Sequence, residues 1–505
     1  MIFLIPLVLW TGVWAGMDAG LVHRLLQWDG VKALIDRLRG TGPLWAASFS
    51  ILLIIWNIVR KNPSGFKLFS PLSLTFAYGL VGIFSSLAFS PRIEISVYWA
   101  AVYVSVPVVL WGTTWGPEAL KVSQRIINMN WVVVFVITTL LFIIGMVFAD
   151  LGSEIWRPST WVECNLYNTW YQDTDETLRP TGVGRFAAIA ALIAMSQAWK
   201  GSHRAVWILI FAAAVLLLFT SGARTAIVGF FAGAVVIAAF YEGRRGLLYG
   251  GIAALVLVPT MWLTGSADTF ASSCFTGRVV NVPIPEPPEP PVAVAPTVPD
   301  DQQPSGTTTA VPAKPVISDS GDYSFGPDIV VLLNEFTEEQ GAALAPEPER
   351  AVTGQDRVGT TVFEKLPLLT LTGRIFVWED GLELIKDRPL LGYGFHADRL
   401  VLREHMHNTY LHGVLQTGLI GVLPLIIGLV LTWILFLKAV LKLSRLTVAH
   451  RHSVILVGGV LALFSVRTIP ESTGALFGVD WLLLAPLLLY LELLTRNETS
   501  GTSDE

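Results

Sequence analysis

The sequence has little charge and almost no cysteine. Only 14% of its 505 residues are charged, 53% are hydrophobic, and the mean hydropathy is +0.58, whereas soluble domains carry about 25% charged residues. This balance excludes an ordinary soluble protein. Two cysteines are too few for a disulfide scaffold and cannot form a zinc site unaided. The composition therefore predicts an all-α polytopic membrane protein.

Long hydrophobic runs are what the sequence has in abundance. A spanning helix needs about 20 mostly apolar residues, and roughly twelve runs meet that requirement. They lie near residues 2–20, 43–59, 68–90, 96–115, 131–149, 184–199, 204–220, 224–241, 247–264, 413–437, 453–470 and 475–494. The first run lacks the basic start and the cleavage site of a signal peptide, so we expect it to be a retained helix.

Clusters of lysine and arginine predict which loops face the cytoplasm, because these residues accumulate there. Three turns are basic, and they contain Lys200 with Arg204, Arg244 with Arg245, and Lys438, Lys442, Arg445 and Arg451. By alternation, the acidic segments 150–183 and 265–407 lie outside and the C-terminus lies inside. The first loop conflicts with this count because it carries Arg24, Lys32, Arg37 and Arg39. The orientation of the first helix therefore stays open.

These assignments divide the chain into four parts. They are an N-terminal bundle of about nine helices in 1–264, a periplasmic loop between the ninth and tenth helices in 265–407, the C-terminal spanning helices in 408–495 and a cytoplasmic tail in 496–505. The external segments hold Cys164 and Cys274, one in each. A disulfide between them and two unrelated thiols are both open interpretations.

Two features stand out within the large loop. Residues 281–315 are rich in proline, so they are predicted to form a disordered, solvated insert. A short amphipathic helix is predicted over 374–388, because its apolar residues recur at helical spacing, and Pro389 ends it. The residues of its apolar face are Ile375, Trp378, Leu382 and Ile385.

Four arginines are predicted near the outer boundary, where arginine is unusual: Arg179, Arg185, Arg224 and Arg374. Arg224 stands in "FTSGARTAIVG" between two apolar runs, where an unpaired guanidinium in lipid would cost about 3 kcal/mol. It should therefore face a polar cavity, or else reach lipid phosphates. Guanidinium groups match phosphate oxygens bidentately, so the four together imply an anionic ligand, most simply a phosphate or diphosphate. A lipid-linked diphosphate fits both the charge and the membrane.

The stretch "HMHNTYLHGVLQTGLIG" precedes and enters a spanning run. Asn408 is suited to cap the helix that follows, and we also count it among the predicted substrate-binding residues. His407 lies at the outer mouth of that helix, where an imidazole can take a proton from an attacking hydroxyl or orient a substrate. The alternative is that His407 is a capping or interfacial residue. His405 and His412 are weaker candidates for the same role.

Glycines surround this stretch. Gly392 and Gly394 allow a tight turn before it. Gly418 and Gly421 are predicted to be close-packing positions within the helix, and Pro424 is predicted to kink it.

These motifs resemble those of a known family. "HNTYLHGVLQTGLIG" is similar to the His-Asn, nine residues, Gly-x-x-Gly signature of the O-antigen ligase and polysaccharide polymerase superfamily. "RPLLGYGF" resembles the segment that precedes this signature in the family, and "TSGART" resembles its Ser-Arg helix turn. The sequence departs from the family in its Pro-rich insert and in Ser-Gly-Ala-Arg where Ser-Arg is commoner.

The resemblance implies a C-type membrane glycosyltransferase of the bacterial inner membrane, with its active site facing the periplasm. It would move a glycan from undecaprenyl diphosphate to a hydroxyl of a glycan or lipid A-core acceptor, by one inverting displacement, without a metal or cofactor. The partners implied are this donor, the acceptor and membrane lipid, with no nucleic acid. O-antigen ligase and repeat polymerase both remain open.

The resemblance also implies residue roles. His407 matches the histidine to which the family assigns activation of the acceptor hydroxyl. Arg224 matches the arginine that contacts the diphosphate, Arg374 matches the loop arginine before an aromatic residue, and Arg179 or Arg185 matches the arginine before the sixth helix.

Three alternatives remain. Asp173-x-Asp175, with Glu176 beside it, has the spacing of a metal-diphosphate site, although an acidic solvated loop has the same composition. A secondary transporter can also have about twelve helices, but it usually pairs ionisable groups within the membrane, and only Asp480 lies deep in a predicted run. A scaffold that recruits a partner through the Pro-rich loop is the third.

Overall fold

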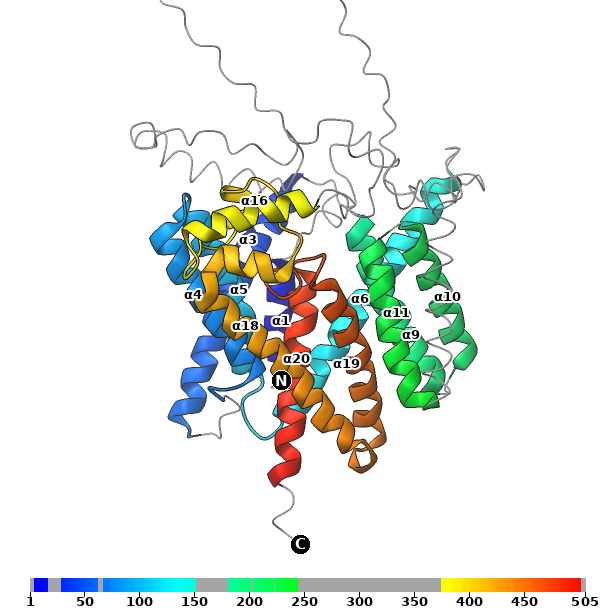
Figure 1. The fold of residues 1–505 in the computed structure, drawn as a ribbon. Coiled ribbons are helices and arrows are strands. Elements are labelled where there is room, and N and C mark those ends of the chain that lie inside the picture. The colour runs from blue at the N-terminus through cyan, green and yellow to red at the C-terminus, as the bar shows by residue number, and fades with distance from the viewer. Residues whose placement is uncertain are drawn as a thin grey trace, which may run out of the picture. The chain divides into compact units, whose positions relative to one another are not determined.

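A computed structural model describes residues 4–16, 29–61, 67–150, 180–200, 203–221, 223–243 and 374–500 (Figure 1). All regular structure within these residues is helical. The α-helices are α1 (Leu4–Ala15), α3 (Asp29–Val59), α4 (Pro71–Phe89), α5 (Ile93–Thr113), α6 (Ala119–Asp150), α9 (Pro180–Lys200), α10 (Arg204–Thr220), α11 (Arg224–Glu242), α16 (Arg374–Asp387), α17 (Ala397–Leu400), α18 (Thr409–Leu441), α19 (Val448–Arg467) and α20 (Val479–Ser500). A short 3-10 helix, η4 (Leu443–Arg445), follows α18.

Eight helices in the described part of the chain are long and apolar enough to cross a membrane, namely α3, α4, α5, α6, α9, α11, α18 and α19. Two shorter apolar helices, α1 and α10, and the last helix, α20, coincide with three more of the predicted runs. The run near 247–264 lies outside the described residues. The prediction of an all-helical, multi-pass membrane protein is confirmed for the described residues, and the total of about twelve spanning helices stays a prediction.

Several helices extend beyond the apolar runs that predicted them. Helix α3 begins at Asp29, so residues 32–39, which we expected in the first loop, lie on a helix. Helix α6 begins at Ala119, and α20 continues to Ser500, into the predicted tail. Apolar length underestimates helix length because a helix can continue into the headgroup region and water, where polar side chains are tolerated.

Helix α20 forms the centre of the packing. It contacts α6, α18, α4, α5 and α19, and every residue from 481 to 494 is buried. A helix that is apolar on all sides buries all sides. By contrast, α3 exposes Trp45, Phe49 and Trp56 by 55% or more, as expected of a spanning helix with one face toward lipid.

Helix α16 lies crosswise over α18 in Figure 1 and contacts it. It begins at Arg374 and ends at Asp387, just before Pro389. Trp378 Nε1 donates a hydrogen bond to Met406 O at 2.8 Å. Gly381 lets the Met406 side chain approach, since a Cβ at this glycine would lie 2.0 Å from Met406 Cε. Helix α16 therefore holds the segment that leads into α18.

The predicted apolar face of α16 is only partly covered. Ile375, Trp378 and Ile385 are half-buried. Leu382 is 44% exposed, so it does not share the contact as the helical spacing predicted.

Helix α18 is broken at Gly418, whose φ of 60° and ψ of −167° are not helical. The segment 389–394 replaces the missing intrahelical hydrogen bonds. Leu419 N–H and Ile420 N–H donate to this segment at 2.8 and 3.1 Å, and two of its own N–H groups donate to α18 at 2.9 and 2.8 Å. A Cβ at Gly418 would lie 2.1 Å from the carbonyl carbon of Leu390. Only glycine meets both requirements.

The other predictions for this region have mixed outcomes. The tight turn is confirmed, since φ is 62° at Gly392 and 91° at Gly394. Gly421 packs against Thr417 of its own helix. The predicted kink at Pro424 stays a prediction, because Pro424 lies inside α18 and the non-helical backbone is at Gly418.

Some predictions fall outside the described residues. They are Arg179, Cys164 and Cys274, the Asp173-x-Asp175 motif with Glu176, and the insert 281–315.

Candidate active site

Glu471 joins two residues that the sequence singled out. It lies in the segment between α19 and α20, and its side chain is 11% exposed. Glu471 Oε2 lies 3.4 Å from His407 Nδ1, and Oε1 lies 3.4 Å from Arg374 Nη2. Arg374 also donates to Pro470 O. We call His407, Arg374 and Glu471 the Glu471 cluster.

The contacts of Glu471 keep it ionised. Burial raises the pKa of its carboxyl, but the hydrogen bond with His407 and the charges of Arg467 and Arg374 outweigh burial and lower the pKa to about 2. A charged carboxylate at Nδ1 favours the tautomer in which Nδ1 carries the proton, so that Nε2 has a lone pair. The His407 side chain is 33% exposed and can be reached by a substrate.

The backbone of His407 is strained. Its φ of 44° lies in the left-handed region, which costs a non-glycine residue about 1–3 kcal/mol. Thr409, two residues further on, holds this conformation, because its N–H donates to Thr468 O at 2.9 Å and its Oγ1 donates to Glu471 O at 2.8 Å. Strain of this kind is found at functional sites, where the surrounding structure fixes one side chain in one direction.

Asn408 is the N-cap of α18, as predicted. Its side-chain oxygen accepts from Tyr410 N–H and Leu411 N–H, both at 2.9 Å, and Nδ2 donates to Ile469 O at 2.8 Å. The side-chain amide of Asn408 is therefore engaged in hydrogen bonds to the backbone of the protein. They link α18 to the segment after α19, so Asn408 positions His407 through the backbone.

A second cluster contains two arginines and one carboxylate, and we call Arg185, Arg467 and Asp480 the Asp480 cluster. Asp480 Oδ1 lies 3.2 Å from Arg185 Nη1, and Asp480 Oδ2 lies 3.4 Å from Arg467 Nη2. Thr473 Oγ1 donates to Asp480 Oδ2 at 3.0 Å. Asp480 is therefore a helix-start residue that pairs with two cations.

The sequence did not single out Arg467 or Glu471. Arg467 is the last residue of α19 and only 2% exposed. An arginine at the end of an apolar run, followed by an aspartate near the start of the next, was a signal that could have found the pair. Glu471 lay in a short polar turn with no motif around it.

Arg224 begins α11, as the apolar run predicted. Its neighbour, Thr225, accepts a hydrogen bond from Arg467 Nη1 at 3.4 Å. The start of α11 therefore lies beside the Asp480 cluster.

The segment 467–480 connects the two clusters. It supplies Arg467, Glu471 and Asp480, while α9, α16 and the residues before α18 supply Arg185, Arg374 and His407. Three arginines face two carboxylates, so the site has an excess of positive charge with a histidine beside it. Such a site is suited to a phosphate-bearing ligand.

The fold and this site define a class: a multi-pass helical membrane protein with an arginine-rich polar site at the ends of several helices. Residues 207–426 match the family model described as O-Antigen ligase, which confirms the resemblance predicted from the sequence. The match contains Arg224, Arg374 and His407, whereas Arg185 and the segment 467–480 lie beyond it.

One curated relative agrees with this match. The chain is 35% identical over 119 residues to the Exopolysaccharide production protein ExoQ of Rhizobium meliloti (strain 1021). The similar region is 20% of this chain and 26% of the relative. The family model and the curated relative thus both support assigning the chain to the O-antigen ligase-like superfamily of polysaccharide assembly proteins.

Proposed function

We propose that this protein transfers a glycan from undecaprenyl diphosphate to an acceptor hydroxyl at the periplasmic face of a bacterial inner membrane. The observation that supports this most directly is the contact of His407 with the buried Glu471 carboxylate, beside an excess of arginines. A base held by a carboxylate next to a cationic site is what a glycosyl diphosphate and a hydroxyl require.

In the proposed step, His407 Nε2 takes the proton of the acceptor hydroxyl while its oxygen attacks the anomeric carbon. The bond from that carbon to the diphosphate oxygen breaks, and undecaprenyl diphosphate leaves. Glu471 positions the imidazole and stabilises the imidazolium that forms. One displacement inverts the anomeric centre.

The arginines have different tasks in this proposal. Arg374 and Arg185 are 19% and 20% exposed, so they contact the diphosphate together with Arg224. Arg467 is buried and positions Asp480, which in turn orients Arg185. Because the leaving diphosphate meets guanidinium groups, this transfer needs no metal ion to neutralise its charge.

Ligase and polymerase differ in the acceptor. A ligase would use a lipid A-core sugar, and we propose this role first because residues 207–426 match the O-Antigen ligase model. A repeat polymerase would use the end of another glycan, and the similarity to an exopolysaccharide production protein favours it as the second candidate.

The test uses a strain that lacks the gene. It is complemented with wild type, His407→Ala, Arg185→Gln or the control His203→Ala, which alters an exposed histidine just before α10. We expect wild type and the control to restore long surface polysaccharide on gels, and the two site variants to leave undecaprenyl-linked glycan unconsumed. Short repeats that accumulate indicate a polymerase, and long unattached chains indicate a ligase. Full restoration by both site variants, at equal membrane abundance, would overturn the proposal.

A further inference from the structure

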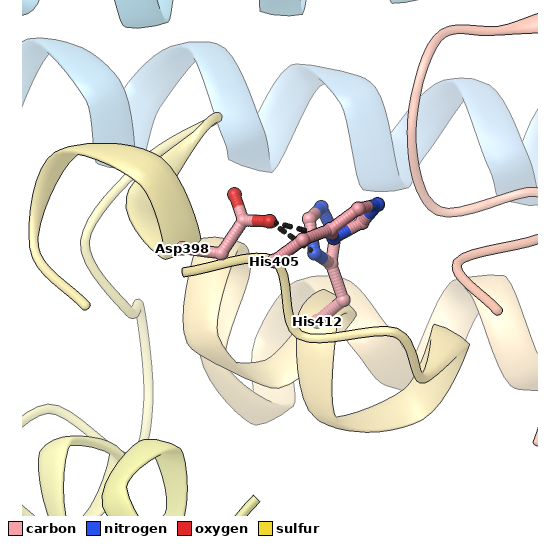
Figure 2. Close-up of side chains that lie close together, drawn as sticks. All are labelled: Asp398, His405 and His412. Carbon is pink, nitrogen blue, oxygen red and sulfur yellow. Dashed lines mark ion pairs between the residues drawn. The ribbon is translucent and has the colours of Figure 1, made fainter. Parts of the chain in front are cut away.

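Two histidines near His407 point toward a buried aspartate (Figure 2). Asp398 comes from α17, His405 from the segment that follows, and His412 from the first turn of α18. Asp398 Oδ2 lies 3.0 Å from His405 Nδ1 and 3.3 Å from His412 Nδ1. The side chains of Asp398 and His412 are 1% and 0% exposed. We call these three residues the His-Asp cluster.

The hydrogen bonds around Gln416 favour one tautomer of His412. All polar atoms of the Gln416 amide are satisfied when its oxygen accepts from His412 Nε2 at 2.6 Å and from His396 N–H at 3.3 Å, while its nitrogen donates to Ala475 O and Tyr78 Oη. His412 then carries its proton on Nε2. Its Nδ1 presents a lone pair to Asp398 Oδ2, which is also an acceptor.

Two acceptors that face each other at 3.3 Å in a buried site repel unless a cation lies between them, which is either a proton on Nδ1 or a metal ion. The Asp398 carboxylate lies near one guanidinium, Arg399, whose Nε is 3.9 Å from Oδ2 and so beyond hydrogen-bonding distance. Neither oxygen of Asp398, nor His412 Nδ1, makes a well-aligned hydrogen bond with any described residue, although all three atoms are buried. The backbone N–H of His407 approaches His405 Nδ1 only at 3.5 Å.

The spacing of these atoms fits a metal ion. One ligand atom from each residue lies within 4.8 Å of the others. Ligands about 2.1 Å from a tetrahedral zinc ion are roughly 3.4 Å apart, which is close to the observed 3.0 and 3.3 Å. Two imidazoles and a carboxylate are a common ligand set for zinc, and the bond from His412 Nε2 to Gln416 is the contact that metal-bound histidines usually make with their second nitrogen.

We propose that Asp398, His405 and His412 bind a divalent transition-metal ion, in the first place zinc, with a water or another ligand in the fourth position. The ion would tie α17 and the segment before α18 to the first turn of α18. In the sequence, His407 lies between the two ligands His405 and His412. The bound ion would therefore hold the strained backbone of His407 in place. Its role is structural, it takes no part in the transfer step, and the site stands whichever reaction the protein performs.

The test measures metal content and stability on the full chain, purified in detergent through a tag without histidine. Wild type should retain about one zinc per chain by elemental analysis. Asp398→Asn and His412→Gln should retain less than about a tenth of that, and the control His203→Gln should match wild type. Zinc added to chelator-treated wild type should raise its unfolding temperature in a saturable way, with no such shift for Asp398→Asn.

Equal metal in the site variants and the control would show adventitious binding and overturn the proposal. So would wild type that holds no metal and gains no stability from zinc. If both site variants fail to fold, the site is tested instead by adding cobalt(II) to chelator-treated wild type and measuring its visible absorption. Visible absorption of tetrahedral cobalt that saturates at about one equivalent supports the site, and its absence refutes the site.

Discussion

Replacing Glu471 by glutamine should slow the transfer step and leave donor binding nearly unchanged, because the amide oxygen can still accept a hydrogen bond from Arg374, whose Nη2 lies 3.4 Å from Glu471 Oε1. Glutamine keeps the shape of the side chain but removes the charge that faces His407 Nδ1 at 3.4 Å. A hydrogen bond to a charged group contributes about 1.5–3 kcal/mol. Because 3.4 Å exceeds the usual length for such a bond, we take the lower value of about 1.5 kcal/mol, which corresponds to about a tenfold fall in kcat.

The assay follows transfer from purified lipid-linked donor in vesicles, with kcat and the donor KM measured separately. Glu383→Gln is the matched control, since Glu383 is 72% exposed on α16 and pairs with Lys386 across one helical turn. The unfolding temperature of each variant excludes loss of the fold as the cause of a slower reaction.

A double-mutant cycle separates a positioning role from a structural one. If Glu471 acts through His407, Glu471→Gln should lower kcat by less than about twofold in a His407→Ala background. A kcat for Glu471→Gln within about twofold of wild type, or an undiminished effect in the His407→Ala background, would refute the reasoning.

Three further predictions concern stability. Asp480→Asn leaves the buried Arg467 and the partly exposed Arg185 without their carboxylate and should destabilise the protein by about 3 kcal/mol, seen as a lower unfolding temperature; an unchanged temperature would contradict the ion pairing. Gly418→Ala should prevent the close approach of Leu390 and abolish stable folding, whereas Gly182→Ala, with open space around its Cβ position, should be tolerated. Asn408→Ala should cost about 1 kcal/mol through loss of the cap, measured by denaturation, and a neutral result would mean that water replaces the cap.

Several features were predictable because they depend on near neighbours in the chain. The cap at Asn408, the turn at Gly392 and Gly394, and the end of α16 before Pro389 each follow from one residue type and its local backbone. The membrane-spanning helices follow from apolar length.

Partners far apart in the chain were not predictable. Arg185 and Asp480 are 295 residues apart, and His407 and Glu471 are 64 apart. The break in α18 likewise depends on the segment 389–394, which replaces hydrogen bonds that the helix alone would have kept.

The sequence by itself therefore determined that the helices of this protein are apolar enough to cross a membrane, and which residue types its site contains. Only the tertiary structure decided which carboxylate faces which cation. The physical reason is that apolar runs and caps act within one helix, whereas a buried charge is stable only beside the partner that packing brings to it.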